Sequence, residues 1–280
     1  MLYQHNATLY VAGRSQSKAD TAVEAIKKAY PDSKGSISIM LLDLADLPSI
    51  KPAVEKFTAT EKQLHVLTLN AGVMTPPKGS KTTQGFELQL GTNCIGSYLL
   101  YKLLRPTLIS TAQASSVPAT VRVTWAASLA VDLQAPKPGG VKFVDAATGE
   151  PAQDLNVNAL YGQSKAGNRF LAAVGARADE EHGILHVAWN PGNLDTELQR
   201  HMPNMMQIVL AKVLLFPAKF GGYTELWSAV GPIDMANSGG YVAPWGRIDK
   251  NRKDVEQECA KGGAGDKFVG WCDKVTAEYV

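Results

Sequence analysis

Leu64-His-Val-Leu-Thr-Leu-Asn-Ala-Gly72 is a short apolar run that ends abruptly in a polar turn. Apolar and β-branched residues in such a run predict a buried strand, and the Asn and Gly after it predict a turn. Further runs of this character lie at 7–13, 36–43, 121–128, 185–192 and 240–243. Apolar strands of this kind are typical of a parallel sheet that is covered on both faces.

Helical patterns separate these strands. They cover 17–30, 47–60, 86–104, 161–178 and 198–229, with Pro106 predicted to stop the third and Pro217 to divide the last. Strands that alternate with helices, joined by right-handed crossovers, predict an α/β fold with a doubly wound, mostly parallel, Rossmann-like sheet. No change of composition marks a boundary, so we expect residues 1–280 to form a single domain.

The bulk composition argues against several classes of protein. A net charge of +2 does not favour nucleic acid or an anionic membrane as partner. The three cysteines have neither disulfide nor zinc spacing, and the five histidines share no metal-ligand spacing. The N-terminus has no signal-peptide pattern, and the apolar run 208–216 is too short to span a bilayer. We therefore expect a cytoplasmic protein without a membrane span or a metal site.

Tyr161-Gly-Gln-Ser-Lys165 carries the first chemical signal. Residues four apart on a helix share one face, so the phenol and the ammonium group are predicted to be neighbours. A nearby ammonium stabilises a phenolate and lowers the tyrosine pKa from about 10 toward neutrality, where the side chain can exchange a proton. Alone, so short a motif more often marks an amphipathic helix with a solvated lysine.

Other residues follow in an order that makes this motif specific. Asn70-Ala-Gly72 follows one strand, Asn93 lies in the next helix, and Ser128 ends the strand after it. In these segments the chain resembles the short-chain dehydrogenase/reductase family over nearly its whole length. The segments are Leu9-Tyr-Val-Ala-Gly-Arg14, Leu42-Asp-Leu44, Leu69-Asn-Ala-Gly72, Gly91-Thr-Asn93, Trp125-Ala-Ala-Ser128, Tyr161-Gly-Gln-Ser-Lys165 and Asn190-Pro-Gly-Asn-Leu-Asp-Thr196. Gly72-Val-Met-Thr-Pro-Pro77 and Pro244-Trp-Gly-Arg247 resemble its fungal branch related to retinol-type dehydrogenases.

The resemblance implies four catalytic residues. Tyr161 is expected to be the general acid in reduction and the base in oxidation, with Lys165 lowering its pKa and binding the nicotinamide ribose. Ser128 is expected to hydrogen-bond the substrate carbonyl and stabilise the developing oxyanion. Asn93 is expected to hold a water that links Lys165 to solvent. Because many residues separate Ser128 from Tyr161, the segment between them must loop out for the two to meet.

The cofactor is predicted to be NADP(H). After its second strand, a dinucleotide-binding fold carries an acid for the ribose 2′-hydroxyl or an arginine for a 2′-phosphate. The matching position here is Gly13-Arg14-Ser15, which has no acid, and a guanidinium can bind phosphate with two hydrogen bonds. By resemblance, the remaining contacts are Asp43 and Leu44 at the adenine, Asn70, Ala71 and Gly72 at its ribose, and Leu194 and Thr196 at the carboxamide.

One expected part of the family pattern is absent. A dinucleotide-binding unit needs a strand, a glycine-rich turn and a helix N-terminus before the segment that matches Ala7 to Gly13. Here Leu2 to His5 resembles only the end of that helix, so the first strand and the glycine loop are predicted to be missing. Three explanations are open: a start site within a longer enzyme, a chain with weak or no cofactor binding, or direct pairing of the strands at 7–13 and 64–69.

Two functional hypotheses follow. The first is an NADP(H)-dependent oxidoreductase that interconverts a carbonyl and a secondary alcohol on an apolar small molecule, with a role in fungal secondary metabolism suggested by resemblance alone. The apolar residues 202–206 and 208–216 are expected to cover its substrate pocket, although a plain buried helix explains them nearly as well. The second is an N-terminally truncated, non-catalytic family member that acts as a binding or interaction protein. Assembly into a homo-oligomer is left open.

Overall fold

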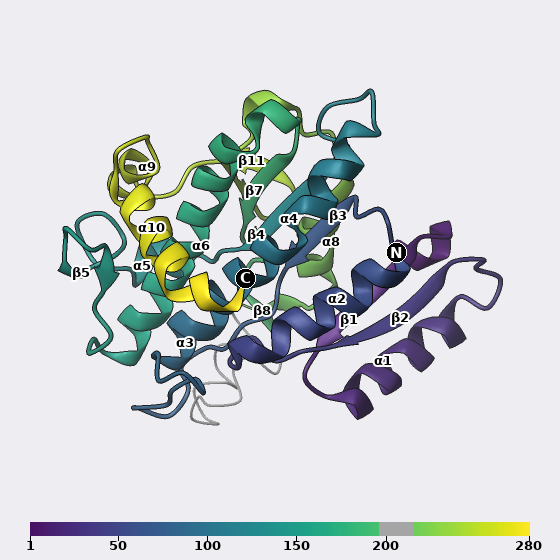
Figure 1. Cartoon of the computed structure of the whole chain (residues 1–280), viewed down its shortest axis with the longest axis horizontal. Coiled ribbons are helices and arrows are strands. Elements are labelled where there is room, and N and C mark those ends of the chain that lie inside the picture. Colours follow the sequence, from purple (N-terminus) through teal and green to yellow (C-terminus); the bar gives the residue numbers. More distant parts are fainter. Residues whose placement is uncertain (196–214) are drawn as a thin grey trace.

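Figure 1 shows a computed structural model that describes residues 1–195 and 215–280, with a larger section of sheet in the middle of the molecule and a smaller one at its side. The larger section has the order β11-β10-β7-β4-β3, and all neighbours except β10 and β11 are parallel. The smaller section pairs β1 with β2 in parallel. The bounds of these strands are β1 Thr8–Gly13, β2 Ser36–Leu41, β3 Val66–Leu69, β4 Arg122–Ala126, β7 Leu185–Trp189, β10 Gly240–Ala243 and β11 Arg247–Asp249. The predicted α/β, mostly parallel architecture is confirmed.

Helices cover both faces of the larger section. α6 and α4 lie over one face, where Val123 and Trp125 of β4 join the main apolar core, and α8 lies over the other with Val187 and Trp189 of β7. The helices are α1 Gln16–Ala29, α2 Ile50–Thr60, α3 Leu88–Leu90, a π-helical turn Gly91–Gly96, α4 Ser97–Gln113, α5 Ala130–Leu133, α6 Val157–Ala178, α8 Lys219–Val230, α9 Lys253–Glu258 and α10 Ala264–Thr276. Among the described residues, no helix has the length and apolar character that a membrane crossing requires.

Short elements complete the chain. Two small strand pairs are present, antiparallel β5 with β6 and parallel β8 with β9. Their bounds are β5 Phe143–Asp145, β6 Glu150–Pro151, β8 Leu194–Asp195 and β9 Phe216–Pro217. The 3-10 turns are Tyr3–His5, Leu47–Ser49, Glu180–His182, Met235–Asn237 and Ala277–Tyr279.

The prediction that Pro106 stops a helix is wrong. α4 continues through this residue to Gln113. A proline removes one backbone donor, which costs a helix of this length only part of its stability. Pro106 faces solvent, whereas Leu104 and Leu108 on either side of it are buried in the main core. Tertiary packing on both sides of the proline therefore outweighs the lost hydrogen bond.

The sheet is divided between β1 and β3. Each pairs on one side only, β1 with β2 and β3 with β4, so the explanation that these two strands close the gap by pairing directly is wrong. β1, β2 and α1 stand at one side of the molecule in Figure 1 around a small apolar cluster of their own, with Tyr3, Val23 and Ile37 at its centre. The other two explanations stay predictions.

A buried carboxylate ties α4, α6 and β7 together. Asp179, at the end of α6, accepts hydrogen bonds from Tyr101 (2.6 Å), Arg105 (2.7 Å) and His186 (2.9 Å). Trp125 donates to the other ring nitrogen of His186, so the imidazole carries its proton on Nε2 and donates it to Asp179. Burial alone raises the pKa of Asp179, but the hydrogen bonds and charges of these partners hold it below its ordinary value.

Replacing this carboxylate should destabilise the fold. In Asp179→Asn the amide group faces donors from three directions, so we expect the free energy of unfolding in urea to fall by about 3–5 kcal/mol. The control is Asp249→Asn, which breaks an exposed ion pair with Arg247 at 3.4 Å and should cost less than about 1 kcal/mol. Equal losses in the two variants would contradict the role given to Asp179.

Candidate active site

Tyr161 and Lys165 lie one turn apart on α6. The helix begins at Val157 because the Asn156 side chain accepts the backbone N–H of Ala159 as an N-cap. Nearly every residue from Leu160 to Ala176 is buried, which includes both candidate catalytic side chains. The Lys165 ammonium lies 5.7 Å from the centre of the Tyr161 ring, so the predicted neighbourhood of phenol and ammonium is present.

Ser128 reaches Tyr161 from the end of β4. Its hydroxyl lies beside the phenol, whose pKa it lowers, and accepts the backbone N–H of Ala130 at 3.1 Å. The segment between them turns away through α5 and the β5–β6 hairpin before it returns to α6. The expectation that this segment loops out so that the two hydroxyl groups can meet agrees with the geometry.

The pKa of Tyr161 differs from the sequence-based expectation. Burial raises it to about 12, and the nearby Ser128 hydroxyl offsets only part of this effect. Burial also lowers the pKa of Lys165 to about 8, and its ammonium donates to the Ala126 carbonyl at 2.8 Å rather than to the phenol. Without a cofactor, desolvation therefore outweighs the ammonium, and the phenol keeps its proton at neutral pH.

Asn93 lies in the π-helical turn, where the backbone departs from α-helical pairing. Its Oδ1 accepts the Val73 N–H at 2.8 Å, and its Nδ2 donates to the Val73 carbonyl and to the Ser164 hydroxyl, both at 3.0 Å. The side chain thus joins the loop after β3 to α6 next to Lys165. Its expected role in holding a water stays a prediction.

A cavity of about 480 Å³ opens beside these residues, at the carboxyl ends of β1, β2 and β3. Six of the predicted cofactor contacts line it: Arg14, Asp43, Leu44, Asn70, Ala71 and Gly72. Arg14 and Asp43 form an ion pair of 3.8 Å at the cavity wall, and both side chains remain accessible. The structure brings these six together, which the sequence could suggest only through the resemblance.

Gly72 joins the cavity to the catalytic residues. A Cβ at this position would lie 2.8 Å from Asn93 Oδ1 and 3.7 Å from Lys165 Nζ. No side chain fits there, so the backbone can pass directly against the Asn93 amide group. Gly72 therefore lies between the cavity and Lys165, while Ser128, Tyr161 and Lys165 are themselves not among the residues of the cavity wall.

Other predicted contacts lie elsewhere. Ser15 is absent from the cavity wall and caps α1, where its hydroxyl accepts the Lys18 N–H at 3.4 Å. Leu194 lies in β8 and packs so closely on Gly221 that a Cβ there would clash with it. Thr196 and residues 202–206 lie outside the described residues, as does 208–216 apart from its last two positions.

Sequence reasoning missed Thr92. This residue lines the cavity, and its hydroxyl oxygen is buried without a hydrogen-bond partner among the described residues. A buried hydroxyl without a partner is costly, which sets Thr92 apart from the other polar residues of the cavity wall. Its position between Gly91 and Asn93 in a matched segment was the available signal, but only the fold shows where the hydroxyl lies.

Comparison with known proteins agrees with this arrangement. Residues 1–124 match the sequence profile described as short chain dehydrogenase. A short-chain dehydrogenase/reductase of Phomopsis amygdali is 42% identical over all of this chain and 85% of its own length. The chain belongs to the short-chain dehydrogenase/reductase family. A further relative in this family, the short-chain dehydrogenase/reductase pkfC of Emericella nidulans, is 39% identical over 91% of this chain and 80% of its own.

Solved structures show the same family fold at low sequence identity. A putative uncharacterized protein from Mycobacterium paratuberculosis superposes with a TM-score of 0.68 at 22% identity, covering 99% of this chain and 86% of its own. The NADPH-bound carbonyl reductase from chicken fatty liver superposes with a TM-score of 0.63 at 18% identity, covering 86% and 83%. At these identities the likeness establishes the fold of this short-chain dehydrogenase/reductase and nothing about its substrate.

Removing the buried ammonium should stabilise this dehydrogenase fold. Holding the Lys165 pKa at about 8 instead of its ordinary 10.5 costs roughly 3 kcal/mol at neutral pH, at about 1.4 kcal/mol per pKa unit. In Lys165→Met we expect a higher free energy of unfolding at pH 7, because Asn168 still donates to the Ala126 carbonyl. The unfolded chain binds the extra proton between pH 8 and 10.5, so the advantage should shrink as pH rises through that window.

Urea titrations at pH 7 and pH 10 measure this effect, with the exposed Lys261→Met as the control that should change little at either pH. A loss of stability in Lys165→Met at pH 7 would mean that the ammonium is well solvated or paired.

Proposed function

We propose that this chain is an NADP(H)-dependent oxidoreductase that interconverts a carbonyl and a secondary alcohol on an apolar small molecule. The observation that carries the proposal is that Ser128 lies beside Tyr161, with Lys165 one helical turn away, and that Gly72 lies between Lys165 and the cavity that Arg14 and Asp43 line. A phenol, a hydroxyl and an ammonium in this arrangement can hold and protonate a carbonyl oxygen.

Ser128, Tyr161 and Lys165 would each have a separate role in the reduction. The Ser128 hydroxyl would donate a hydrogen bond to the substrate oxygen and stabilise the negative charge that develops there. Tyr161, protonated at neutral pH because burial raises its pKa to about 12, would transfer its proton to that oxygen. The Lys165 ammonium would then stabilise the phenolate left behind. A bound nicotinamide cofactor supplies the hydride, and in the reverse direction Tyr161 would accept the proton.

The cavity is suited to hold such a cofactor. Its volume lies within the ~300–1,000 Å³ that small-molecule and cofactor sites occupy. Arg14 directly precedes the N-terminus of α1, so its guanidinium and the helix amide groups could together hold a 2′-phosphate. The guanidinium of Arg14 is the feature that favours NADP(H) over NAD(H), because only NADP(H) carries the 2′-phosphate.

Two finer assignments belong to the same proposal. The stretches 72–77 and 244–247 support a place in the branch related to retinol-type dehydrogenases, and Trp245 packs where a side chain at Gly192 would lie. The relatives reported above come from fungi, which supports a role in fungal secondary metabolism.

One observation favours the alternative of a family member that binds without catalysing. The facing edges of β1 and β3 do not pair among the described residues, so the cavity is bounded by two separate sections of sheet. Such a chain would keep the fold and the side chains of the site but bind the cofactor weakly.

The test of the proposal is turnover of apolar ketones and aldehydes with NADPH by the 280-residue protein, followed by Tyr161→Phe. Loss of the phenolic proton should lower kcat by about 100-fold or more while the fluorescence-measured Kd for NADPH stays within about twofold. The exposed Tyr30→Phe is the matched control and should leave both values unchanged. Binding of NADPH without turnover of any carbonyl compound would favour the alternative, as would the absence of binding.

Cofactor choice gives a separate prediction for Arg14. Removing the guanidinium in Arg14→Ala should raise the Kd for NADPH about tenfold or more and leave the Kd for NADH nearly unchanged, because only NADPH carries the 2′-phosphate. Lys27→Ala, at the far end of α1, is the control for a general loss of positive charge. Equal weakening of NADH and NADPH binding in Arg14→Ala would contradict the assignment.

A further inference from the structure

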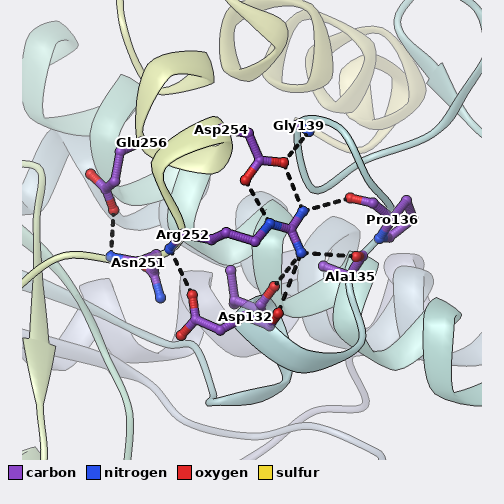
Figure 2. Close-up of polar contacts among 9 residues, drawn as sticks. Asp132, Ala135, Pro136, Gly139, Asn251, Arg252, Asp254 and Glu256 are labelled. Carbon is purple, nitrogen blue, oxygen red and sulfur yellow. Dashed lines mark hydrogen bonds and ion pairs between the residues drawn. The ribbon is translucent and has the colours of Figure 1, made fainter.

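The loop that follows Ser128 depends on a residue from the distant C-terminal part of the chain. α5, at Ala130–Leu133, is a single helical turn, and its last carbonyl groups have no partners within so short a helix. The Arg252 guanidinium supplies donors: the two N–H groups of Nη1 are shared among the carbonyls of Val131 (3.4 Å) and Asp132 (3.4 Å) in α5 and of Ala135 (3.2 Å) just after it. Nη2 donates to the Pro136 carbonyl at 2.8 Å, and Figure 2 shows these bonds converging on one side chain.

Asp132 in turn binds the backbone of Arg252. Its carboxylate accepts the backbone N–H of Arg252 at 2.7 Å, so the loop and the segment before α9 hold each other from both sides. A guanidinium at the carboxyl end of a helical turn also complements the partial negative charge of its carbonyl groups. Arg252 is largely buried, with 16% of its side chain exposed, which strengthens these bonds relative to those of a solvated arginine.

Asp254 fixes the arginine in this orientation. Its carboxylate accepts from Nε at 2.6 Å and from Nη2 at 2.9 Å, a two-point contact that matches the planar guanidinium. The same carboxylate accepts the Gly139 N–H at 2.7 Å, which ties the far end of the loop to the same cluster (Figure 2). The hydrogen bond from Arg252 is the main cause that lowers the pKa of Asp254 to about 2, so the cluster stays charged at working pH.

The held loop rests directly on the catalytic helix. A Cβ on Gly162, next to Tyr161, would clash with the backbone of Gln134 and Ala135. A Cβ on Gly140 would lie 3.0 Å from the Cβ of Ala166, next to Lys165, and 3.0 Å from Val255. At its other end the loop begins at Ser128, whose hydroxyl accepts the Ala130 N–H of α5. Residues 128–140 are thus seated between the catalytic helix and the Arg252–Asp254 pair.

We propose that Arg252, held by Asp254, is a positioning residue that sets the place of Ser128 relative to Tyr161 through residues 130–139. Neither side chain touches the phenol or the Ser128 hydroxyl. The effect passes through backbone groups, since four carbonyls and one amide of the loop are bonded to this pair. The role in turnover rests on the oxidoreductase function proposed above, whereas the role in holding the loop does not.

The test compares Arg252→Gln with Arg252→Lys and with a matched control, Arg177→Gln. Arg177 is also partly buried, donates to the carbonyls of Ala173 and Cys259, and pairs with Asp266, but its contacts lie at the end of α6 away from Ser128. A loss that reflected only global destabilisation would therefore appear in both glutamine variants.

Amide hydrogen exchange of the folded, cofactor-free protein, followed by NMR, is the readout that does not need activity. In Arg252→Gln the Gly139 and Ala130 amides should exchange about tenfold faster or more, because hydrogen bonds to a charged group are lost. Arg252→Lys should recover part of the protection, and Arg177→Gln should leave both amides as in the wild type. Unchanged exchange in Arg252→Gln, or equal acceleration in Arg177→Gln, would overturn the proposal.

Kinetics test the link to the reaction. Arg252→Gln should lower kcat by roughly 10- to 100-fold, the range that a small misplacement of a reacting group costs, with the Kd for NADPH unchanged. A fall in kcat equal to that of Arg177→Gln would overturn the positioning role. If the wild type turns over no carbonyl compound, the oxidoreductase proposal fails, and the exchange rates alone decide whether Arg252 holds the loop that carries Ser128.

Discussion

The burial of Tyr161 and Lys165 on a single helix is the constraint on which the site depends. α6 can be buried along almost its whole length because small residues allow close approach of its neighbours, as Gly162 does for the loop at Gln134 and Ala135. Removal of water raises the pKa of the phenol and lowers that of the ammonium group. The fold therefore holds a protonated acid beside a destabilised cation, and the attraction between that cation and an anion formed next to it is stronger here than in water.

The division of the sheet places the catalytic side chains and the cavity in different parts of the molecule. β4, β7 and α6 form one buried unit that carries Ser128, Tyr161 and Lys165. The cavity instead lies between the pair β1–β2, which has its own small core, and β3 with the loop that follows it. Distances among the catalytic side chains are thus set within the unit of β4, β7 and α6. The width of the cavity depends instead on how β1 and β2 are held against the rest of the molecule. We therefore expect the affinity for the cofactor to vary more than the spacing of the catalytic side chains.

Local pattern predicted most of the fold. Apolar runs predicted the bounds of each strand of the parallel sheet to within a residue or two, because a buried strand consists mostly of apolar residues that can be recognised in the sequence. Pro106 misled the prediction, since the burial of Leu104 and Leu108 that carries α4 past it is a tertiary effect. The expected lowering of the Tyr161 pKa failed for a related reason: spacing shows that Lys165 is near, but not that both groups are desolvated. The order of the residues along the chain identified Ser128 and the cavity-lining residues, but only the fold shows where they lie relative to one another.

Arg252 illustrates what no local pattern can reveal. It lies far along the sequence from Asp132 and Gly139. The segment around it is polar and contains glycine, and nothing in that composition distinguishes an arginine that holds a distant loop from one on a solvated surface. A long segment between Ser128 and Tyr161 costs little in loop-closure entropy, but it needs contacts that fix its conformation next to the reacting groups. Backbone carbonyls at the end of a one-turn helix need donors, and a guanidinium can serve several of them at once. A segment of this length therefore needs contacts that fix its conformation. Arg252, more than a hundred residues later, provides them through its hydrogen bonds to the carbonyls of the segment.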